Sequence, residues 1–263
     1  MTVRCPATAL ALIISLGTAQ PVFAQSMTNA AVIESAAEAL GMVRGPQRRT
    51  DSINTVQFSG NGTMSVPQPD GSPLNYEITE TTVGISYSLP AMRWDLTRVG
   101  PDGDVQRRIQ VVRGDRAWNE RLPGIDPTPV EDQVSRRLRR IWLTPHGIIR
   151  AAADDPAAVS IGSRNGKTTL AVVIDGTPVT ATLDSNFRPE RVEMMIEHRV
   201  LGETLLEAAY TNYVDWPKLD VYFPSRIVQT IGGETTLDLT VTDFFQNPYV
   251  VFPTPEQLNR SSQ

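Results

Sequence analysis

The feature that most constrains this chain is an alternation of apolar and polar residues with a period of two. It recurs in five segments, at residues 55–59, 82–87, 179–183, 191–197 and 237–242. Side chains of a β-strand point alternately to the two faces of a sheet, so this pattern predicts strands rather than helices. Each predicted strand buries one face and shows the other to water.

Turn signals lie between these segments at short intervals. Six dipeptides have this composition: Asp70-Gly71, Asp102-Gly103, Gly114-Asp115, Asn165-Gly166, Asp175-Gly176 and Gly232-Gly233. Gly, Asn and Asp accept the positive φ angles that tight hairpins require. Sequential strands are therefore expected to be antiparallel neighbours, because a parallel sheet needs a helical crossover between strands. The sequence predicts one large antiparallel meander of roughly ten strands.

A first helix is predicted at residues 28–40, where alanine-rich helical spacing replaces the alternation. Thr28 or Asn29 supplies an N-cap, because a short polar side chain can accept a hydrogen bond from the first turn. Gly41 supplies the stop, because glycine readily adopts the conformation that ends a helix. One short helix therefore precedes the first predicted strand.

A helical insertion is predicted at residues 129–153. Its first half places five apolar residues on one stripe and four arginines largely off it: Val130, Val134, Leu138, Ile141 and Trp142, against Arg136, Arg137, Arg139 and Arg140. Thr144 and Pro145 then restart the helix as its N-cap and first-turn residue. A single sheet must cover its apolar face, and these helices are the available cover. The predicted fold class is mainly β with helices (α+β), a single curved antiparallel sheet or half-barrel with short helices on its concave face.

Residues 1–24 have the pattern of an export signal. Arg4 gives the positive start, residues 7–16 form the apolar run, and a small-residue cleavage site follows. The alternative, a retained anchor, needs about 20 apolar residues to span a membrane, and this run is shorter. We therefore expect a cleaved signal and a periplasmic or secreted product without a transmembrane anchor. Length alone allows two domains, but no linker divides the chain, so we expect one domain at residues 25–250 and a tail at 251–263.

Composition removes most familiar catalytic and metal sites. The single cysteine, Cys5, leaves with the predicted signal, which excludes disulfides, cysteine nucleophiles and cysteine–zinc sites. His146 and His198 are the only histidines, too few for a zinc site of three imidazoles. No GxSxG elbow or phosphate loop is present, and we interpret Gly60-Asn61-Gly62 as a hairpin turn. We expect no catalytic residue, metal or cofactor. The less favoured alternative is an enzyme that uses unpaired carboxylates, or His146 as general base rather than as a surface group.

Charge narrows the range of partners. Lys and Arg number 24 against 29 Asp and Glu, a formal net charge of −5, so an exported chain of this kind is not expected to bind nucleic acid. The strongest basic feature is the group Arg136, Arg137, Arg139 and Arg140. Either it binds lipid headgroups or another anionic partner, or it forms a solvated helix face whose aliphatic stems cover apolar surface.

Three tryptophans lie in or near the predicted helix–sheet interface. Trp94, Trp118 and Trp142 either line an apolar ligand cavity or simply fill the core, since an indole contributes much apolar area in both cases. The predicted ligand site comprises these three residues with Leu138 and Ile148, and with Arg136 and Arg140 near its mouth.

Several short motifs resemble a known domain. In chain order they are Arg93-Trp94-Asp95, residues 114–119 (GDRAWN), 142–147 (WLTPHG), 210–213 (YTNY), 223–229 (FPSRIVQ) and 237–242 (LDLTVT). Together they resemble, over roughly residues 30–247, an accessory domain that precedes the hydrolase region of some proteobacterial metallo-β-lactamase-fold proteins. That domain is in turn similar to the half-barrel of the lipoprotein-localisation (LolA/LolB-like) proteins, in which helices close an apolar cavity that takes acyl chains.

The departures from that family limit what the resemblance implies. The hydrolase region with its HxHxDH motif is absent, so neither metal binding nor hydrolysis carries over. The similarity to the lipoprotein carriers lies in architecture, and architecture alone does not settle function. Two hypotheses follow: an exported protein that binds or carries a lipid or other apolar ligand, or a ligand-free interaction module that docks an envelope enzyme or another partner.

Overall fold

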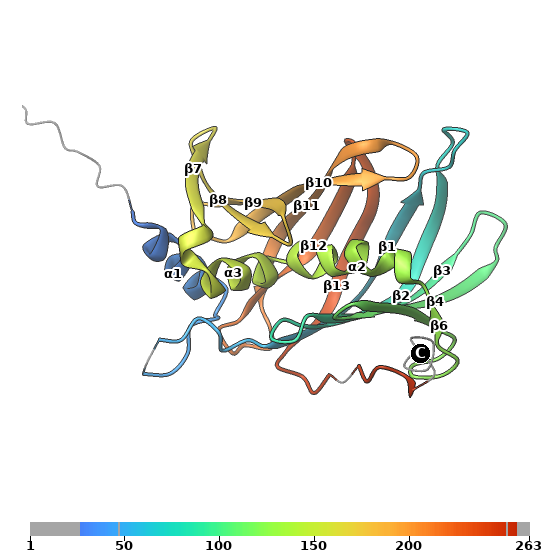
Figure 1. The fold of residues 1–263 in the computed structure, drawn as a ribbon, viewed down its shortest axis with the longest axis horizontal. Helices are drawn as coiled ribbons and strands as arrows, with labels where there is room; N and C mark the ends of the chain where they lie inside the picture. Colours follow the sequence, from blue (N-terminus) through green and yellow to red (C-terminus); the bar gives the residue numbers. More distant parts are fainter. Residues whose placement is uncertain (1–26, 47, 251, 257–263) are drawn as a thin grey trace, which may run out of the picture.

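The structure is a computed structural model that describes residues 27–46, 48–250 and 252–256. Strands account for 53% of it and helices for 16%. The strands of this part of the chain form one open antiparallel sheet, with a few short helices beside it (Figure 1). The predicted mainly β fold with short helices is therefore confirmed. The predicted signal at residues 1–24 lies outside the described residues, as does most of the predicted tail.

Two antiparallel meanders make up the 13-stranded sheet. The first contains β1 (Thr55–Val66), β2 (Leu74–Ser86), β3 (Ala91–Val99), β4 (Val105–Arg113), β5 (Arg116–Glu120) and β6 (Thr128–Pro129). The second contains β7 (Ser160–Arg164), β8 (Lys167–Ile174), β9 (Thr177–Leu183), β10 (Pro189–His198), β11 (Gly202–Asp215), β12 (Tyr222–Ile231) and β13 (Glu234–Gln246). β1 pairs with β13 in the middle of the sheet, so β6 and β7 form its two edges.

The six predicted turns all join neighbouring strands. At the turn between β7 and β8, Asn165 and Gly166 both have positive φ angles, of 53° and 78°. Such a pair matches the right-handed twist of the flanking strands, which is why Asn-Gly is a strong hairpin signal. The short-range topology was therefore predictable from turn chemistry.

The segment Gly60-Asn61-Gly62 is not a hairpin turn, contrary to our interpretation of the sequence. It lies inside β1, and the register with β13 and with β2 shifts at this point. A Cβ atom at Gly60 would lie 2.2 Å from the carbonyl oxygen of Thr240 on β13. Glycine here permits a bulge and a close approach of two backbones, both of which help a sheet to bend.

Three helices lie against one face of the sheet. α1 (Asn29–Ala39) begins after Thr28, whose hydroxyl accepts a hydrogen bond from the amide of Ala31, as predicted. α2 (Val134–Trp142) follows the 3₁₀ turn η1 (Glu131–Gln133), and α3 (Pro145–Asp154) precedes the 3₁₀ turn η2 (Pro156–Ala158). α2 starts later than predicted because Thr128 and Pro129 pair with β5 instead, as the short strand β6.

The segment that carries α2 and α3 connects the two edges of the sheet. It leaves β6, contacts β3, β4 and β5 through α2 and β8 and β10 through α3, and enters β7 (Figure 1). We call the face under the helices the inner face and the other one the outer face. The main hydrophobic core lies between the helices and the inner face.

A second, smaller core lies on the outer face. It contains Ala91, Ile109, Val111, Trp118 and Phe252. Phe252 is buried, and its carbonyl oxygen accepts a hydrogen bond of 2.8 Å from Nη1 of Arg113. Packing of the chain therefore continues past residue 250, where we had placed the start of the tail.

Candidate functional site

An apolar slot lies between the inner face and the junction of α2 and α3. Six of its lining residues come from five strands: Phe58, Val83, Trp94, Ile227, Leu237 and Leu239. Arg140, Leu143 and Thr144 close it on the helical side, and its volume is about 50 Å³. It is the feature of the described surface that best matches the ligand cavity expected from the sequence.

Two buried tyrosines hold the α2–α3 junction against the sheet. The hydroxyl of Tyr210 donates to the carbonyl oxygen of Leu143. The hydroxyl of Tyr87 lies 2.9 Å from Oγ1 of Thr144, which caps α3 by accepting from the amide of Gly147. Burial raises the pKa of both tyrosines, so the hydroxyl protons that make these bonds are retained. The slot therefore has a fixed polar anchor beside its apolar walls.

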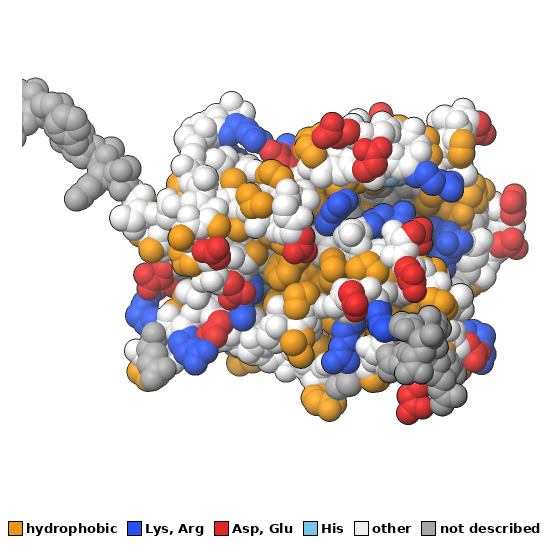
Figure 2. Space-filling view, in the orientation of Figure 1, with side chains coloured by type: hydrophobic (Ala, Val, Ile, Leu, Met, Phe, Trp, Pro, Cys, Tyr) orange, Lys and Arg blue, Asp and Glu red, His pale blue; other side chains and the backbone are white. Residues whose placement is uncertain are grey.

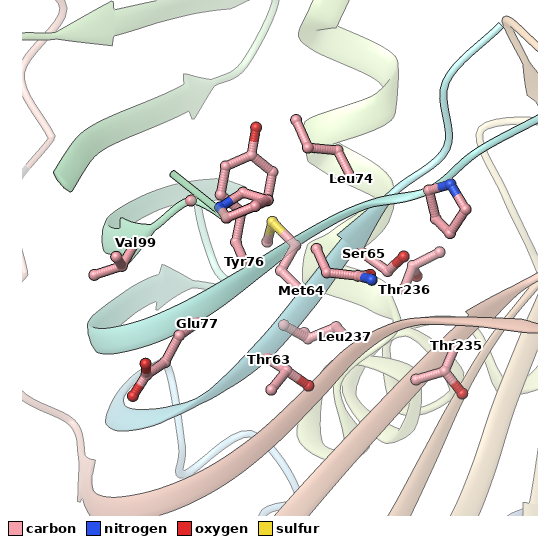
Figure 3. Close-up of a pocket in the computed structure, with 14 residues that line it drawn as sticks. Thr63, Met64, Ser65, Leu74, Tyr76, Glu77, Val99, Thr235, Thr236 and Leu237 are labelled. Atoms are coloured by element: carbon pink, nitrogen blue, oxygen red, sulfur yellow. The ribbon is translucent and has the colours of Figure 1, made fainter. Parts of the chain in front are cut away.

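A wide groove opens next to the slot, with a volume of about 680 Å³ (Figure 3). Tyr76, Met64 and Leu237 are register partners on β2, β1 and β13, and all three line this groove. Leu237 also lines the slot. The groove and the slot therefore share one wall residue.

Arg98 is buried beside this groove. Its guanidinium lies over the Tyr76 ring, 3.5 Å from the centroid, and Nη2 donates to Oε1 of Gln106 at 3.1 Å. Only 4% of Arg98 is exposed, and its Nε has no hydrogen-bond partner among the described residues. Burial lowers the pKa of Arg98, and the nearby Arg108 lowers it further. The groove thus has a buried positive charge close to its wall.

A second arginine covers the slot itself. The guanidinium of Arg140 lies 4.4 Å from the centre of the Trp94 ring, and Nη1 donates to Oε1 of Gln110 at 3.1 Å. Burial, followed by the charges of Arg136 and Arg137, lowers the pKa of Arg140 to about 9. An arginine is rarely deprotonated in a protein, so Arg140 keeps its positive charge in a partly buried position without a carboxylate partner among the described residues.

A basic pocket of about 360 Å³ adjoins Arg140. Arg108 of β4 and Arg136 of α2 line it, together with the same Gln110 that binds Arg140. Figure 2 shows Lys and Arg side chains gathered around a hollow on this side of the molecule. Glu120 also lines the pocket, but its carboxylate is already occupied by other donors.

The donors to Glu120 come from the outer face and from a loop. Nε and Nη2 of Arg93 each donate to it at 3.1 Å, Nε1 of Trp118 donates at 2.9 Å, and so does the amide of Gly124. Its side chain is 1% exposed. The one carboxylate on the lining of the basic pocket therefore binds Arg93, Trp118 and Gly124, and does not pair with Arg108 or Arg136.

The structure brings three of the seven predicted site residues close to the slot. Trp94 and Arg140 line it and stack on each other, and Arg136 lines the adjoining basic pocket. Two residues lie on the other side of α2: Leu138 and Trp142 line a separate pocket of about 70 Å³ with Val179 and Met194.

Two predicted site residues lie away from the slot. Ile148 is fully buried in the main core and lines none of these pockets. Trp118 packs on the outer face, although Ala117 beside it faces the helices. Successive residues of a strand point to opposite faces, and β5 takes the register that turns the indole outward. Trp118 is therefore not part of the candidate site on the inner face.

The arginines of α2 do not form one solvated face. Arg137 is 3% exposed; its Nη1 donates to the carbonyl oxygens of Val111 and Trp118, at 2.9 and 2.6 Å, and its Nη2 to Oδ1 of Asn119 at 2.7 Å. Burial lowers the pKa of Arg137 to about 10. Arg137 therefore holds α2 against β4 and β5, and its guanidinium is engaged by these bonds.

His146 is buried, so our expectation of a surface group was wrong. The centroid of its ring lies 5.8 Å from that of Phe223 and 5.7 Å from that of Phe244, and the side chain has no exposed area. Neither ring nitrogen has a hydrogen-bond partner among the described residues. Burial lowers the pKa of His146 to about 4. The imidazole therefore packs among phenylalanines, away from solvent.

Sequence reasoning missed Arg98 and Arg108. A signal for both was present: Trp94, Leu96 and Arg98 alternate on β3, and Arg108 and Gln110 alternate on β4, so each set points to one face. Neither strand was among the five segments with clear alternation, because polar residues occupy both faces there. The basic character of the inner face was therefore visible only after the strands had been paired.

Two searches of the described residues were negative. No group of three or more His, Cys, Asp or Glu is placed to hold a metal ion. No helix in that part of the chain is long and apolar enough to cross a membrane. In comparisons with known proteins, no family model matches the chain and no curated protein matches it.

Proposed function

We propose that this protein binds an apolar or lipid-like small molecule in the slot and the adjoining groove, and carries it outside the cytoplasm. The observation that supports this most directly is that the slot and the groove lie side by side, with Leu237 as a shared wall residue. The export signal predicted at residues 1–24 and the resemblance to half-barrels that accept acyl chains support the same conclusion. In this proposal the sheet is a half-barrel, the inner face is its concave side, and the helices are its cover.

The dimensions suit a chain-like ligand better than a bulky one. A volume of 50 Å³ has room for about four water-sized groups, so the slot takes only the end of a hydrocarbon chain. The groove, at about 680 Å³, lies within the usual range for small-molecule sites and holds the remainder. Burial contributes about 0.8 kcal/mol per methylene, so even six methylenes give about 5 kcal/mol before the cost of association.

The proposal is tested first with the unaltered protein. Material purified from the envelope of its own cells is analysed by native mass spectrometry and by organic extraction, and the stripped protein is titrated with the uncharged dye N-phenyl-1-naphthylamine. We expect a copurifying apolar molecule and saturable dye fluorescence. Absence of both, in repeated preparations, would falsify the proposal.

A pair of variants locates the binding site. Leu237→Trp fills the point where the groove meets the slot, and we expect it to weaken dye binding by about tenfold or more. Val173→Trp is the matched control, because Val173 is 58% exposed on β8 and lines neither space. If both folded variants bind the dye with equal affinity, the dye binds at another place and the proposed site is wrong.

The interaction module remains the second candidate, and the narrowness of the slot is the observation that favours it. In that case the same fold docks an envelope enzyme or another periplasmic partner and holds no ligand. Crosslinking in intact cells distinguishes the two candidates. A single abundant crosslinked protein together with an empty slot supports the module.

A further inference from the structure

Four arginines, two on the inner face of the sheet and two on α2 above it, have no carboxylate partner among the described residues. They are Arg98, Arg108, Arg136 and Arg140, which we call the inner-face arginines. None of them forms an ion pair with a described residue, although eleven such pairs occur elsewhere in that part of the protein. The chain as a whole has a net charge of −5, so this group of unpaired arginines forms a local positive region in an acidic protein.

Their polar contacts are all to neutral groups. Arg98 binds the amide oxygen of Gln106 and contacts the Tyr76 ring, and Arg140 binds the amide oxygen of Gln110 and stacks on an indole. A buried positive charge is costly unless a negative group compensates it. For Arg98 and Arg140 the described residues supply hydrogen bonds and aromatic faces but no carboxylate.

The positions of these arginines define where that charge would sit. Arg108 and Arg136 face the basic pocket from β4 and α2, and both are exposed to solvent. Arg140 lies one helical turn after Arg136; it lines the apolar slot and donates a hydrogen bond to Gln110, which lines the basic pocket. An oxyanion in the pocket and a hydrocarbon chain in the slot would therefore both lie close to Arg140.

We propose that the ligand is an anionic amphiphile, whose carboxylate or phosphate head is bound by Arg108, Arg136 and Arg140 while its chain occupies the slot. Guanidinium groups suit this role because they bind planar oxyanions through two parallel hydrogen bonds. Arg98 reinforces the positive potential from the groove side. This inference rests on the proposed function and adds the chemistry of the head group to it.

Four probes that share a ten-carbon alkyl chain but differ in their heads test the head group separately from the chain. Decanoate, decyl phosphate, 1-decanol and decyltrimethylammonium are titrated below their micelle concentrations by calorimetry. We expect the two anions to bind about tenfold or more tightly than 1-decanol, since a charge-assisted hydrogen bond exceeds a neutral one by that order. The cation should bind most weakly. The preference for anions should decrease with added salt.

Variants assign this preference to the inner-face arginines. The double variant Arg108→Gln, Arg136→Gln should reduce the anion preference to about threefold or less and leave 1-decanol affinity unchanged. The matched double control is Arg139→Gln, Arg199→Gln: it removes the same charge, with Arg139 on the opposite side of α2 and Arg199 in an exposed turn. The control should keep the full preference. Loss of preference in both double variants would assign it to net charge and overturn the proposal.

The remaining outcomes separate this inference from the function on which it rests. Equal affinity for all four heads removes the anion site and leaves the apolar site standing. No binding of any probe, 1-decanol included, contradicts the proposed function itself. Inorganic phosphate is the final arm: if it binds alone as tightly as decyl phosphate, the site recognises a free oxyanion and the amphiphile proposal is wrong.

Discussion

Arg140 stacks on Trp94 with 4.4 Å between its guanidinium carbon and the ring centre, whereas Arg137, three residues earlier on the same helix, is enclosed by backbone carbonyls. The two side chains share a helix and a charge, but they differ in what replaces the water around them. Arg140 has one amide and an aromatic face; Arg137 has three oxygen acceptors. This contrast leads to the first prediction.

Arg137→Met should destabilise the fold, whereas Arg140→Met should change its stability little. The first substitution removes three hydrogen bonds to buried acceptors, and we expect a loss of about 2–4 kcal/mol in the free energy of unfolding. The second loses a cation–π contact of about 1 kcal/mol and the hydrogen bond to Gln110, but it also removes a poorly compensated charge, so the change should stay within about 1 kcal/mol. Urea unfolding of both variants at pH 7 measures the difference, and equal losses would contradict it.

His146 should make the protein less stable in mild acid. Its pKa is about 4 in the folded state and 6.5 as a free side chain, so between these values the unfolded chain binds a proton that the folded chain does not. Above pH 6.5 His146 is neutral in both states and does not reduce the free energy of unfolding. As the pH falls towards 4, protonation of the unfolded chain lowers that free energy by about 3 kcal/mol in total. His146→Phe should remove this part of the pH dependence, as measured by urea unfolding between pH 4 and 7.

The other histidine provides the control for that experiment. His198 lies at the end of β10, where its Nδ1 accepts from the amides of Val200 and Leu201. His198→Gln should retain the acid sensitivity of the unaltered protein. An unchanged pH profile in His146→Phe would show that other groups cause the sensitivity.

Glu120→Gln should cost about 3 kcal/mol of stability, because it breaks a buried ion pair and leaves the Arg93 charge without its partner. Asp238→Asn is the comparison: Asp238 also binds an arginine, Arg226, through two hydrogen bonds, but both side chains are substantially exposed. An exposed pair contributes about 1 kcal/mol or less. Thermal and urea unfolding should therefore rank the two variants clearly, and a similar cost for both would contradict the assignment of Glu120 as a buried anchor.

Gly60→Ala should destabilise the centre of the sheet by about 1–3 kcal/mol, the usual cost of forcing an extra group into a packed region. Its Cβ would collide with the backbone carbonyl of Thr240, which cannot rotate away as a side chain can. Gly100→Ala is the control, because a Cβ there would meet Tyr76 only at an ordinary contact distance of 3.6 Å. Circular dichroism melting of the two variants tests the difference, and equal midpoints would show that β1 and β13 separate more easily than their packing suggests.

Local features of the fold were predictable because they depend on neighbouring residues. The alternation of Val56 and Phe58, or of Leu237 and Leu239, reports the buried face of a strand directly, and the Thr28 and Thr144 caps report where helices begin. The pairing of β1 with β13 was not predictable in this way. It joins segments at opposite ends of the chain, and no local signal distinguishes it from the continuation of a meander.

The candidate site was predictable only in part, for the same reason. Trp94, Arg136 and Arg140 were found from residue type and helical position, but whether an indole faces the helices depends on strand register. Trp118 differs from Ala117 by one position in β5, and that single step puts it on the other side of the sheet. The contribution of Arg98 and Arg108 required knowledge of which strands are neighbours.

The route of the chain between β6 and β7 has a mechanical consequence. These strands are the two margins of the sheet, and the segment with α2 and α3 ties one to the other across the inner face. The separation of the margins is therefore limited by the length and tilt of two helices whose junction is held by Tyr87 and Tyr210. Moving the two edges of the sheet apart therefore requires α2 and α3 to shift at the same time. Entry of the proposed ligand into the slot would need this coupled movement, and not the opening of a single hinged segment.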